Sequence, residues 1–130
     1  MGQFSQQSQK RLDTCHPLLQ MIFYDIVRTF DCSIIDGHRP MHRQNQLYRE
    51  GKSKLIYPNS KHNQFPSLAV DVAPYPIDWA DIRRFYYFGG YVLGVVRSIG
   101  IKIRWGGDWD GDRQVKDQEF NDLIHFELGD

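Results

Sequence analysis

The sequence predicts an α+β fold in which helices pack on one side of a small and mainly antiparallel sheet. Helical and strand-like patterns mix along the 130 residues without the strict strand–helix–strand order of a parallel sheet. A chain of this length also has ordinary domain size, and its 41% hydrophobic content is enough for a single core. We therefore expect residues 1–130 to form a single domain.

The first helix is expected over residues 15–30, where apolar side chains recur at helical spacing. Thr14 or Asp13 can serve as its N-cap, because a side-chain oxygen there accepts a hydrogen bond from the first turn. The short apolar run 32–35 predicts a strand that ends at Gly37.

Pro40 suits the first position of a second helix, and Gly51 is placed to close it. The following segment, 52–66, is predicted to be a loop. Residues 68–72 alternate large apolar residues with smaller or polar ones, which is typical of a strand. The alternation places Asp71 on the face opposite the apolar row.

The last third of the chain predicts a helix, a strand, a loop and a final strand, at 78–98, 101–105, 106–118 and 125–128. Asp78 is a candidate N-cap for this helix. Gly89, Gly90 and Gly94 within it either weaken the helix or indicate close packing against the sheet.

The charge balance argues against two classes of partner. Sixteen basic and sixteen acidic residues cancel, so no overall field would hold the protein on nucleic acid or on an anionic membrane. No apolar run reaches the ~20 residues of a membrane span, and the polar N-terminus does not resemble an export signal. We expect no nucleic-acid binding and no membrane insertion.

Cys15 and Cys32 are the only two cysteines. A chain able to bury a core does not need a disulfide framework, so we expect reduced and buried thiols.

Four residues carry the functional prediction. His62, Asp71 and His125 supply two imidazoles and a carboxylate, and Asp122 is a spare acid three residues before the last histidine. Catalytic zinc usually takes three such ligands and leaves a fourth position to water. His125 also shares a strand face with Glu127. No short metal-binding motif is present, so spacing alone leaves metal binding open.

A second histidine pair competes with this set. His38 and His42 are four residues apart, which on one helix would give a plausible metal-binding face. Pro40 argues against it, because a helix that starts at this proline leaves His38 outside. His16 is expected to lie at a helix start without a chemical role.

An acidic run between the last two strands resembles a calcium loop. Asp108, Asp110 and Asp112 occupy alternate positions, and Glu119 falls at the twelfth. The sixth position, however, is Arg113 where the EF-hand loop has glycine. A solvated acidic turn is therefore favoured.

The chain resembles the zinc peptidases related to D-alanyl-D-alanine carboxypeptidases, and within them the phage endolysins of the L-alanyl-D-glutamate peptidase type. Many members of the wider family place the aspartate seven residues after the histidine, whereas here Asp71 lies nine after His62. The phage branch resembles this longer form, and an unpaired loop can bulge outward without moving either ligand. The resemblance runs through residues 37–39, 44–48, 51–53, 58–62, 66–76, 104–109 and 122–128.

The resemblance implies a role for each matching residue. The two histidines and Asp71 would hold Zn²⁺ on the face of the sheet, and Asp122 would be the general base. Arg39 matches an arginine that helps to bind substrate or to stabilise the oxyanion, and Ser60 matches a position near the substrate. Gln44 is a further candidate for substrate contact. Trp105 and Trp109 suit packing, although either could line the substrate groove.

The resemblance also implies a peptidase domain that acts on peptidoglycan, cutting between L-alanine and D-glutamate of the stem peptide. Such an endolysin of a phage or prophage would be a monomer that collects in the host cytoplasm and reaches the wall when a holin opens the membrane. Two alternatives remain: a D-alanyl-D-alanine carboxypeptidase or dipeptidase, and a non-catalytic wall-binding module with structural zinc. Asp122 argues against the second, since a structural site needs no base.

A carboxypeptidase needs a cationic end to its groove for the terminal carboxylate. Beyond Arg39, the residues expected near the metal are aromatic or acidic and offer no obvious second clamp. The sequence thus favours an endopeptidase.

Overall fold

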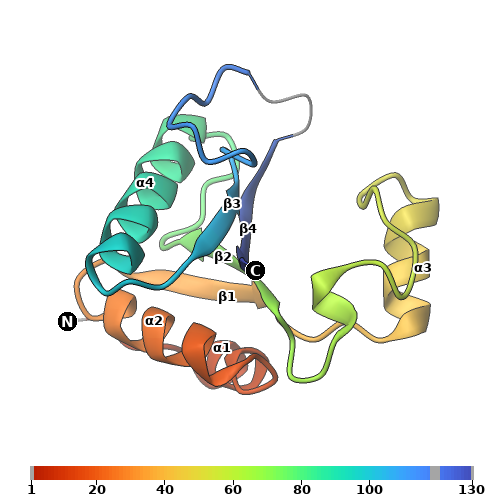
Figure 1. Cartoon of the computed structure of the whole chain (residues 1–130). Helices are drawn as coiled ribbons and strands as arrows, with labels where there is room; N and C mark the ends of the chain where they lie inside the picture. Colours follow the sequence, from red (N-terminus) through yellow and green to blue (C-terminus); the bar gives the residue numbers. More distant parts are fainter. Residues whose placement is uncertain (1, 118–120, 130) are drawn as a thin grey trace.

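The structure, a computed structural model, describes residues 2–117 and 121–129 (Figure 1). Within these residues, no helix has the length and apolar character needed to cross a membrane. The elements in chain order are α1 (Gln6–Leu12), α2 (Pro17–Val27), β1 (Cys32–Asp36), α3 (Met41–Arg49), the 3₁₀ turn η1 (Lys61–Asn63), β2 (Ala69–Pro74), α4 (Ile82–Ser98), β3 (Ile103–Gly106) and β4 (Asp122–Leu128).

The four strands form one antiparallel sheet in the order β1-β2-β4-β3. Strands β2 and β4 are the central pair, and their register sets Asp71 directly opposite His125. Directly opposed residues of an antiparallel pair share a face and lie close together. Residues more than fifty positions apart are thereby brought side by side.

Helices α1, α2 and α4 pack on one face of the sheet, as predicted. Leu12, Phe23 and Val92 from these helices form one core with Val72 and Phe126 from the central strands. The predicted alternation along β2 is confirmed, since its valines join this core while the aspartate between them does not. The α+β architecture with helices on one side is therefore correct.

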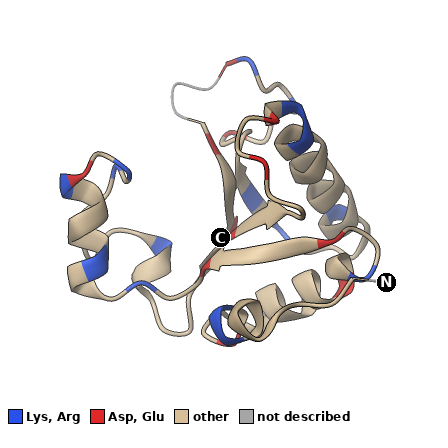
Figure 2. Ribbon diagram, turned by 180° about the vertical axis from the view of Figure 1, so that it is seen from behind, with Lys and Arg blue, Asp and Glu red and all other residues tan. Residues whose placement is uncertain are grey.

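Helix α3 stands apart from the other three helices, and Figure 1 and Figure 2 both show it at a distance from the sheet. Pro40 is its N-cap rather than its first residue. Gly51 follows its end with a φ of +75°, which is the left-handed conformation expected of a closing glycine. Figure 2 also shows both signs of charge spread over the chain, in keeping with the zero net charge.

The start of the first predicted helix is wrong. Helix α2 begins at Pro17, and its N-cap is His16, whose Nδ1 accepts a hydrogen bond from the Leu18 amide. Asp13 instead caps the C-terminus of α1, a helix that the sequence analysis missed. Seven mostly polar residues are too short a window for hydrophobic periodicity to identify a helix.

The long helix α4 also begins later than predicted, at Ile82 with Asp81 as its N-cap in place of Asp78. Close packing is confirmed for Gly89, because a Cβ on it would lie 2.2 Å from the Trp105 ring. The other two glycines of this helix face open space.

A bulge in β1 redirects one acidic side chain. Ile34 pairs with Val72, but Asp36 pairs with Asp71, so two residues of β1 oppose one residue of β2. An extra residue reverses the alternation beyond it. Asp36 therefore joins Asp71 on the face that carries no helix layer, whereas Ile34 stays in the core.

Candidate metal centre

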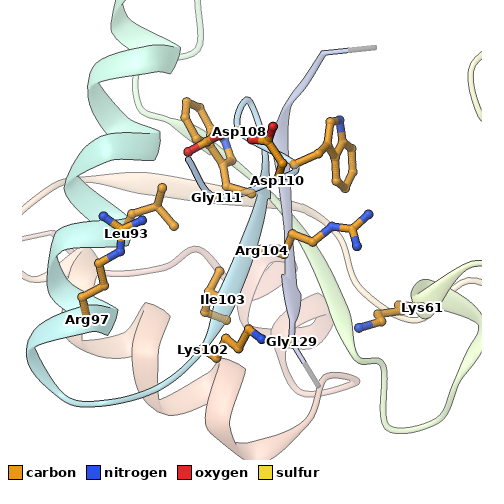
Figure 3. A pocket seen from close by; sticks show the side chains of 12 residues that line it. Lys61, Leu93, Arg97, Lys102, Ile103, Arg104, Asp108, Asp110, Gly111 and Gly129 are labelled. Carbon is orange, nitrogen blue, oxygen red and sulfur yellow. The ribbon is translucent and has the colours of Figure 1, made fainter. Parts of the chain in front are cut away.

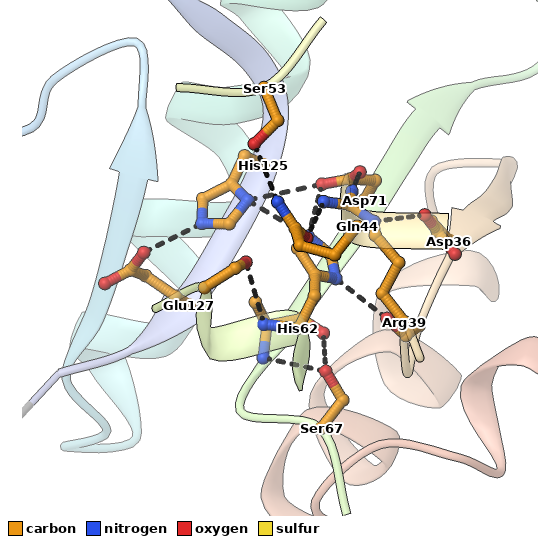
Figure 4. Close-up of polar contacts among 12 residues, drawn as sticks. Asp36, Arg39, Gln44, Ser53, His62, Ser67, Asp71, His125 and Glu127 are labelled. Atoms are coloured by element: carbon orange, nitrogen blue, oxygen red, sulfur yellow. Dashed lines mark hydrogen bonds and ion pairs between the residues drawn. The ribbon is translucent and has the colours of Figure 1, made fainter. Parts of the chain in front are cut away.

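His62 from η1, Asp71 from β2 and His125 from β4 converge on the polar face of the sheet (Figure 4). His62 Nε2 lies 3.1 Å from Asp71 Oδ1 and 3.2 Å from His125 Nδ1, and the distance between His125 Nδ1 and Asp71 Oδ1 is 3.3 Å. All three side chains are buried. The structure thus brings together the three residues that the sequence nominated as metal ligands.

The other ring nitrogen of each histidine has a partner that fixes its tautomer. His62 Nδ1 lies 2.8 Å from the carbonyl oxygen of Gly37, so it donates to that oxygen. His125 Nε2 lies 2.8 Å from Glu127 Oε1 and donates to that carboxylate. Both neutral rings therefore direct an unprotonated nitrogen toward Asp71, which is the arrangement of metal-binding histidines with hydrogen-bonded outer partners.

This geometry fits a small divalent cation. A tetrahedral site with ~2.0–2.1 Å metal–ligand bonds has edges of ~3.3 Å, close to the three distances among these atoms. Three lone pairs facing one another repel unless a positive charge lies between them. The group can therefore hold a metal ion.

The electrostatics favour positive charge at the same point. Burial by itself raises the pKa of Asp71, but His62 and His125 together hold that pKa well below its usual range. Burial lowers the pKa of His125, yet hydrogen bonds to Asp71 and Glu127 outweigh it and raise this pKa to about 9. A bound cation supplies that positive charge with the histidine neutral.

A short capped turn holds His62 in place. The Ser60 hydroxyl accepts from the His62 amide, while Asn63 Oδ1 accepts from the Ser60 amide. Ser60 and Asn63 three residues apart form a capping box, a signal that the sequence analysis overlooked. Residues 64–66, in the longer spacing before Asp71, are exposed, as expected for a loop that bulges outward.

Arg39 is buried behind the carboxylate of Asp71. Its Nη2 donates to Asp71 Oδ2 at 3.1 Å, and its Nε donates to Asp36 Oδ2 at 2.8 Å. The bulge in β1 supplies this second acid, which the sequence analysis did not identify. Arg39 thus orients the carboxylate whose other oxygen faces the histidines.

Gln44 is fully buried and uses all of its hydrogen-bonding capacity within the chain. Its amide nitrogen donates to Ser53 Oγ and to the Leu55 carbonyl, and its oxygen accepts from Arg39 and Asn63. The expected contact between Gln44 and a substrate does not fit this arrangement. Gln44 instead ties α3 and the loop after it to the arginine behind the metal centre.

The two tryptophans near the site differ in role. Trp105 is 3% exposed, packs in the core and donates its indole N–H to the Leu123 carbonyl, so a substrate has little of it to contact. Trp109 is only partly buried, and its ring lies 5.4 Å from the His125 ring. Of the pair, Trp109 is the better candidate for the groove wall.

Asp122 is the first residue of β4, a strand that begins three residues earlier than predicted. Both Leu123 and Phe126 pack against the core although they are three residues apart, so the strand alternation is interrupted between them. Burial raises the pKa of Asp122, and the negative charge of Asp71 raises it further. Asp122 therefore lies within electrostatic reach of the metal-binding group.

Glu127 orients His125 and faces away from the convergent atoms. Its Oε1 accepts a hydrogen bond from His125 Nε2, and its Oε2 lies 3.3 Å from Lys61 Nζ. Burial raises the pKa of Glu127, but His125 and the nearby cations lower it overall. This position suits a supporting residue better than a base.

The acidic loop is not the fully solvated turn that the sequence favoured. Asp108 is buried: its Oδ2 accepts a hydrogen bond from the Arg113 amide, and its Oδ1 has no hydrogen-bond partner among the described residues. Arg113 adopts a φ of +68°, so it takes the glycine-like conformation despite its side chain. Asp108, Asp110 and Asp112 form a second group able to hold a cation; Glu119 lies outside the described residues.

Comparison with known proteins identifies the family. The family described as phage L-alanyl-D-glutamate peptidase matches residues 1–129. The L-alanyl-D-glutamate peptidase of Escherichia phage T5 is 31% identical over 120 residues, which cover 88% of this chain and 87% of that protein. The crystal structure of the Serratia marcescens L-Ala D-Glu endopeptidase ChiX matches with a TM-score of 0.73 and 25% identity, over 98% of this chain and 91% of that one. The chain therefore belongs to the phage L-alanyl-D-glutamate peptidase family.

Proposed function

We propose that this protein is a zinc-dependent endolysin that hydrolyses the L-alanyl-D-glutamate bond of the peptidoglycan stem peptide. Family membership makes it a peptidoglycan-cleaving peptidase. The proposal of zinc rests on one observation, the convergence of two unprotonated imidazole nitrogens and a carboxylate oxygen at 3.1–3.3 Å from one another. Nitrogen and oxygen donors at such spacing suit zinc.

His62, Asp71 and His125 would hold the ion. When bound, zinc would acidify a water molecule and polarise the scissile carbonyl group. The remaining work belongs to the chain: Arg39 fixes the aspartate, and Glu127 fixes the second histidine. Rigid outer partners of this kind raise metal affinity and keep the ligands aligned.

Asp122 is proposed as the general base. It would accept the proton from the attacking water and return it to the leaving amine of D-glutamate. Its raised pKa helps in this role, because a carboxylate with a higher pKa holds the proton more firmly during transfer. Three of the five N–H groups of Arg39 bind Asp36, Asp71 and Gln44, and the other two would be available to the oxyanion.

The finer biological setting follows the family. We propose a monomer that stays in the host cytoplasm until a holin opens the membrane, and that then reaches the wall. Co-expression with and without a holin, followed by culture turbidity, tests the route. Light scattering of the purified protein tests whether it is a monomer.

Mass spectrometry of digested wall is the decisive experiment. Purified peptidoglycan treated with the protein should show new amino groups on D-glutamate and L-alanine as the new carboxyl end on the muramyl side. Elemental analysis should find about one zinc per chain, as three ligands with an open position imply. Free D-alanine as the main product would instead identify a carboxypeptidase.

A further inference from the structure

A cationic pocket of about 270 Å³ opens along the outer edge of β3 (Figure 3), and one of its lining residues, Trp109, has its ring 5.4 Å from that of His125. Its lining includes two tryptophans, four cationic residues and two aspartates, so positive charge is in excess. Such a pocket favours an anionic ligand. The cationic residues are Lys61, Arg97, Lys102 and Arg104.

Arg104 is the cation best placed to act on a substrate. Strand β3 turns Ile103 toward the core, so Arg104 lies on the face of the metal centre, opposite Glu127 in the neighbouring strand. Its guanidinium carbon is 5.0 Å from the centre of the Trp109 ring, and that ring rests on His125. Trp109 therefore lies between Arg104 and His125, a proposed metal ligand, and contacts both.

The N–H donors of the Arg104 guanidinium are available to a ligand. Glu127 lies 3.9 Å from Arg104 Nε, beyond hydrogen-bond distance, whereas the same carboxylate has closer partners in His125 at 2.8 Å and Lys61 at 3.3 Å. Within residues 2–117 and 121–129 no hydrogen bond occupies the Arg104 guanidinium, and its side chain is 53% exposed. A planar fork stacked on an aromatic ring is suited to bidentate contact with a carboxylate.

The proposed substrate carries a carboxylate at the matching place. In the stem peptide, D-glutamate continues through its side-chain carboxyl group, so its α-carboxylate remains free on the carbon that bears the scissile nitrogen. We propose that Arg104, supported by Trp109, binds this α-carboxylate and makes the enzyme selective for an unmodified D-glutamate. The subsite rests on the proposed function of the metal centre.

The proposed subsite would supply a cation that the sequence did not reveal near the metal. Arg104 lies in a predicted strand, and the local sequence does not show which residues lie beside it in the sheet. Antiparallel pairing of β3 with β4 brings it opposite Glu127. The clamp here serves an internal carboxylate beside the scissile bond, so it agrees with an endopeptidase.

Two synthetic muramyl peptides test the proposal, identical except that one has the α-carboxylate of D-glutamate and the other its carboxamide. The wild-type protein should cleave the carboxylate form with a kcat/KM ~10- to 100-fold higher, the usual effect of a charge-assisted contact. Arg104→Gln should lower kcat/KM for the carboxylate form by a similar factor and bring the ratio close to one. Its zinc content should stay at the wild-type level.

Arg97→Gln is the matched control, since it removes a cation from the same pocket on the α4 side and should keep the wild-type ratio. Equal cleavage of both peptides by the wild-type protein would overturn the subsite while leaving the proposed function intact, and this result needs no variant. An Arg104→Gln protein that keeps the wild-type preference would also overturn it. Cleavage of neither peptide at the L-alanyl-D-glutamate bond would refute the proposed function itself.

Discussion

The two faces of the sheet use neighbouring residues of the same strands, yet they are held by different forces. On the helix side, Val72 and Phe126 are completely buried among apolar side chains. On the other side, Asp71 and His125 are nearly as buried, but each of their polar atoms has a polar neighbour. Stability therefore depends mainly on the first face, and chemistry on the second.

The polar face has a built-in cost. Three metal-binding atoms face one another. Gly37 and Glu127 bind the other ring nitrogens of the two histidines, so the three facing atoms cannot donate hydrogen bonds to one another. Such a site is less favourable without its cation than a fully paired network would be. Substitutions on the two faces should accordingly separate metal binding from folding.

Adjacent residues of β4 give the largest contrast. His125→Ala should lose most of its zinc, and its kcat/KM should fall by ~10³-fold or more, because metal assistance supplies several kcal/mol to the transition state. Phe126→Leu should keep zinc and activity at low temperature but lose ~1 to 2 kcal/mol of unfolding free energy. Elemental analysis and denaturant unfolding measure the two effects. Full zinc occupancy in His125→Ala would remove this residue from the ligand set.

Asp122→Asn sharpens the same contrast within the polar face. The substitution keeps the shape but removes the basic carboxylate, so zinc should remain while turnover falls by ~10²-fold or more. Asp110→Asn, an exposed acid of the neighbouring loop, is the control and should retain zinc. Hydrolysis of wall at the wild-type rate by Asp122→Asn would mean that another group acts as the base.

Glu127→Gln should have an intermediate effect. The amide can no longer accept the His125 proton with a full negative charge, so zinc affinity should fall by ~10- to 100-fold. Activity should recover in excess zinc, because Glu127 does not face the convergent atoms. Competition with a zinc chelator gives the affinity. An unchanged affinity would show that His125 is oriented by its packing alone.

The same comparison explains which features the sequence could predict. The core face and the ligand face of β2 follow from the alternation of residues 68–72, since a strand's period fixes which side chains share a face. His62, Asp71 and His125 could be nominated because their residue types are those of a metal site. Pro40 argued against His38 and His42, and the resemblance to a family then decided for metal binding by the other three.

Features that depend on pairing between distant strands could not be predicted. The bulge that turns Asp36 toward Arg39 exists only in the register between β1 and β2. Arg104 meets Glu127 only because β3 pairs with β4. The sequence suggested that Gln44 contacts substrate, but in the structure its amide nitrogen donates to Ser53 and Leu55 in the loop after α3. Local patterns contain none of this information.

A smaller effect is expected on the core face, where two neighbouring glycines of α4 form a matched pair. Gly89→Ala would place its Cβ 2.2 Å from the Trp105 ring, so overpacking should cost ~1 to 3 kcal/mol, less the ~1 kcal/mol that alanine contributes to a helix. Gly90→Ala faces open space and should instead stabilise the protein by ~0.5 to 1 kcal/mol. Urea unfolding compares them, and equal stability of the two variants would contradict the close packing. Zinc content should not change in either.

The last effect concerns the two thiols, which lie in the core on the helix side. Burial raises the pKa of Cys15 and of Cys32 to about 12, from 9.0 in an unfolded chain. Below pH 9 both states hold the thiol protons, and the stabilisation is complete. Between pH 9 and 12 the unfolded chain ionises first, so each thiol should reduce stability by ~1 kcal/mol per pH unit.

Other groups also titrate in this alkaline range, so the effect of the thiols is obtained by difference. A Cys15→Ala, Cys32→Ala double variant lacks both protons and should lose stability less steeply above pH 9 than the wild type. Urea unfolding at pH 8 and pH 10 gives the four values needed. Parallel losses in the two proteins would mean that the thiols ionise as easily in the folded state as in the unfolded chain. In that case water would reach the helix side of the sheet, and the two faces would differ less than their packing implies.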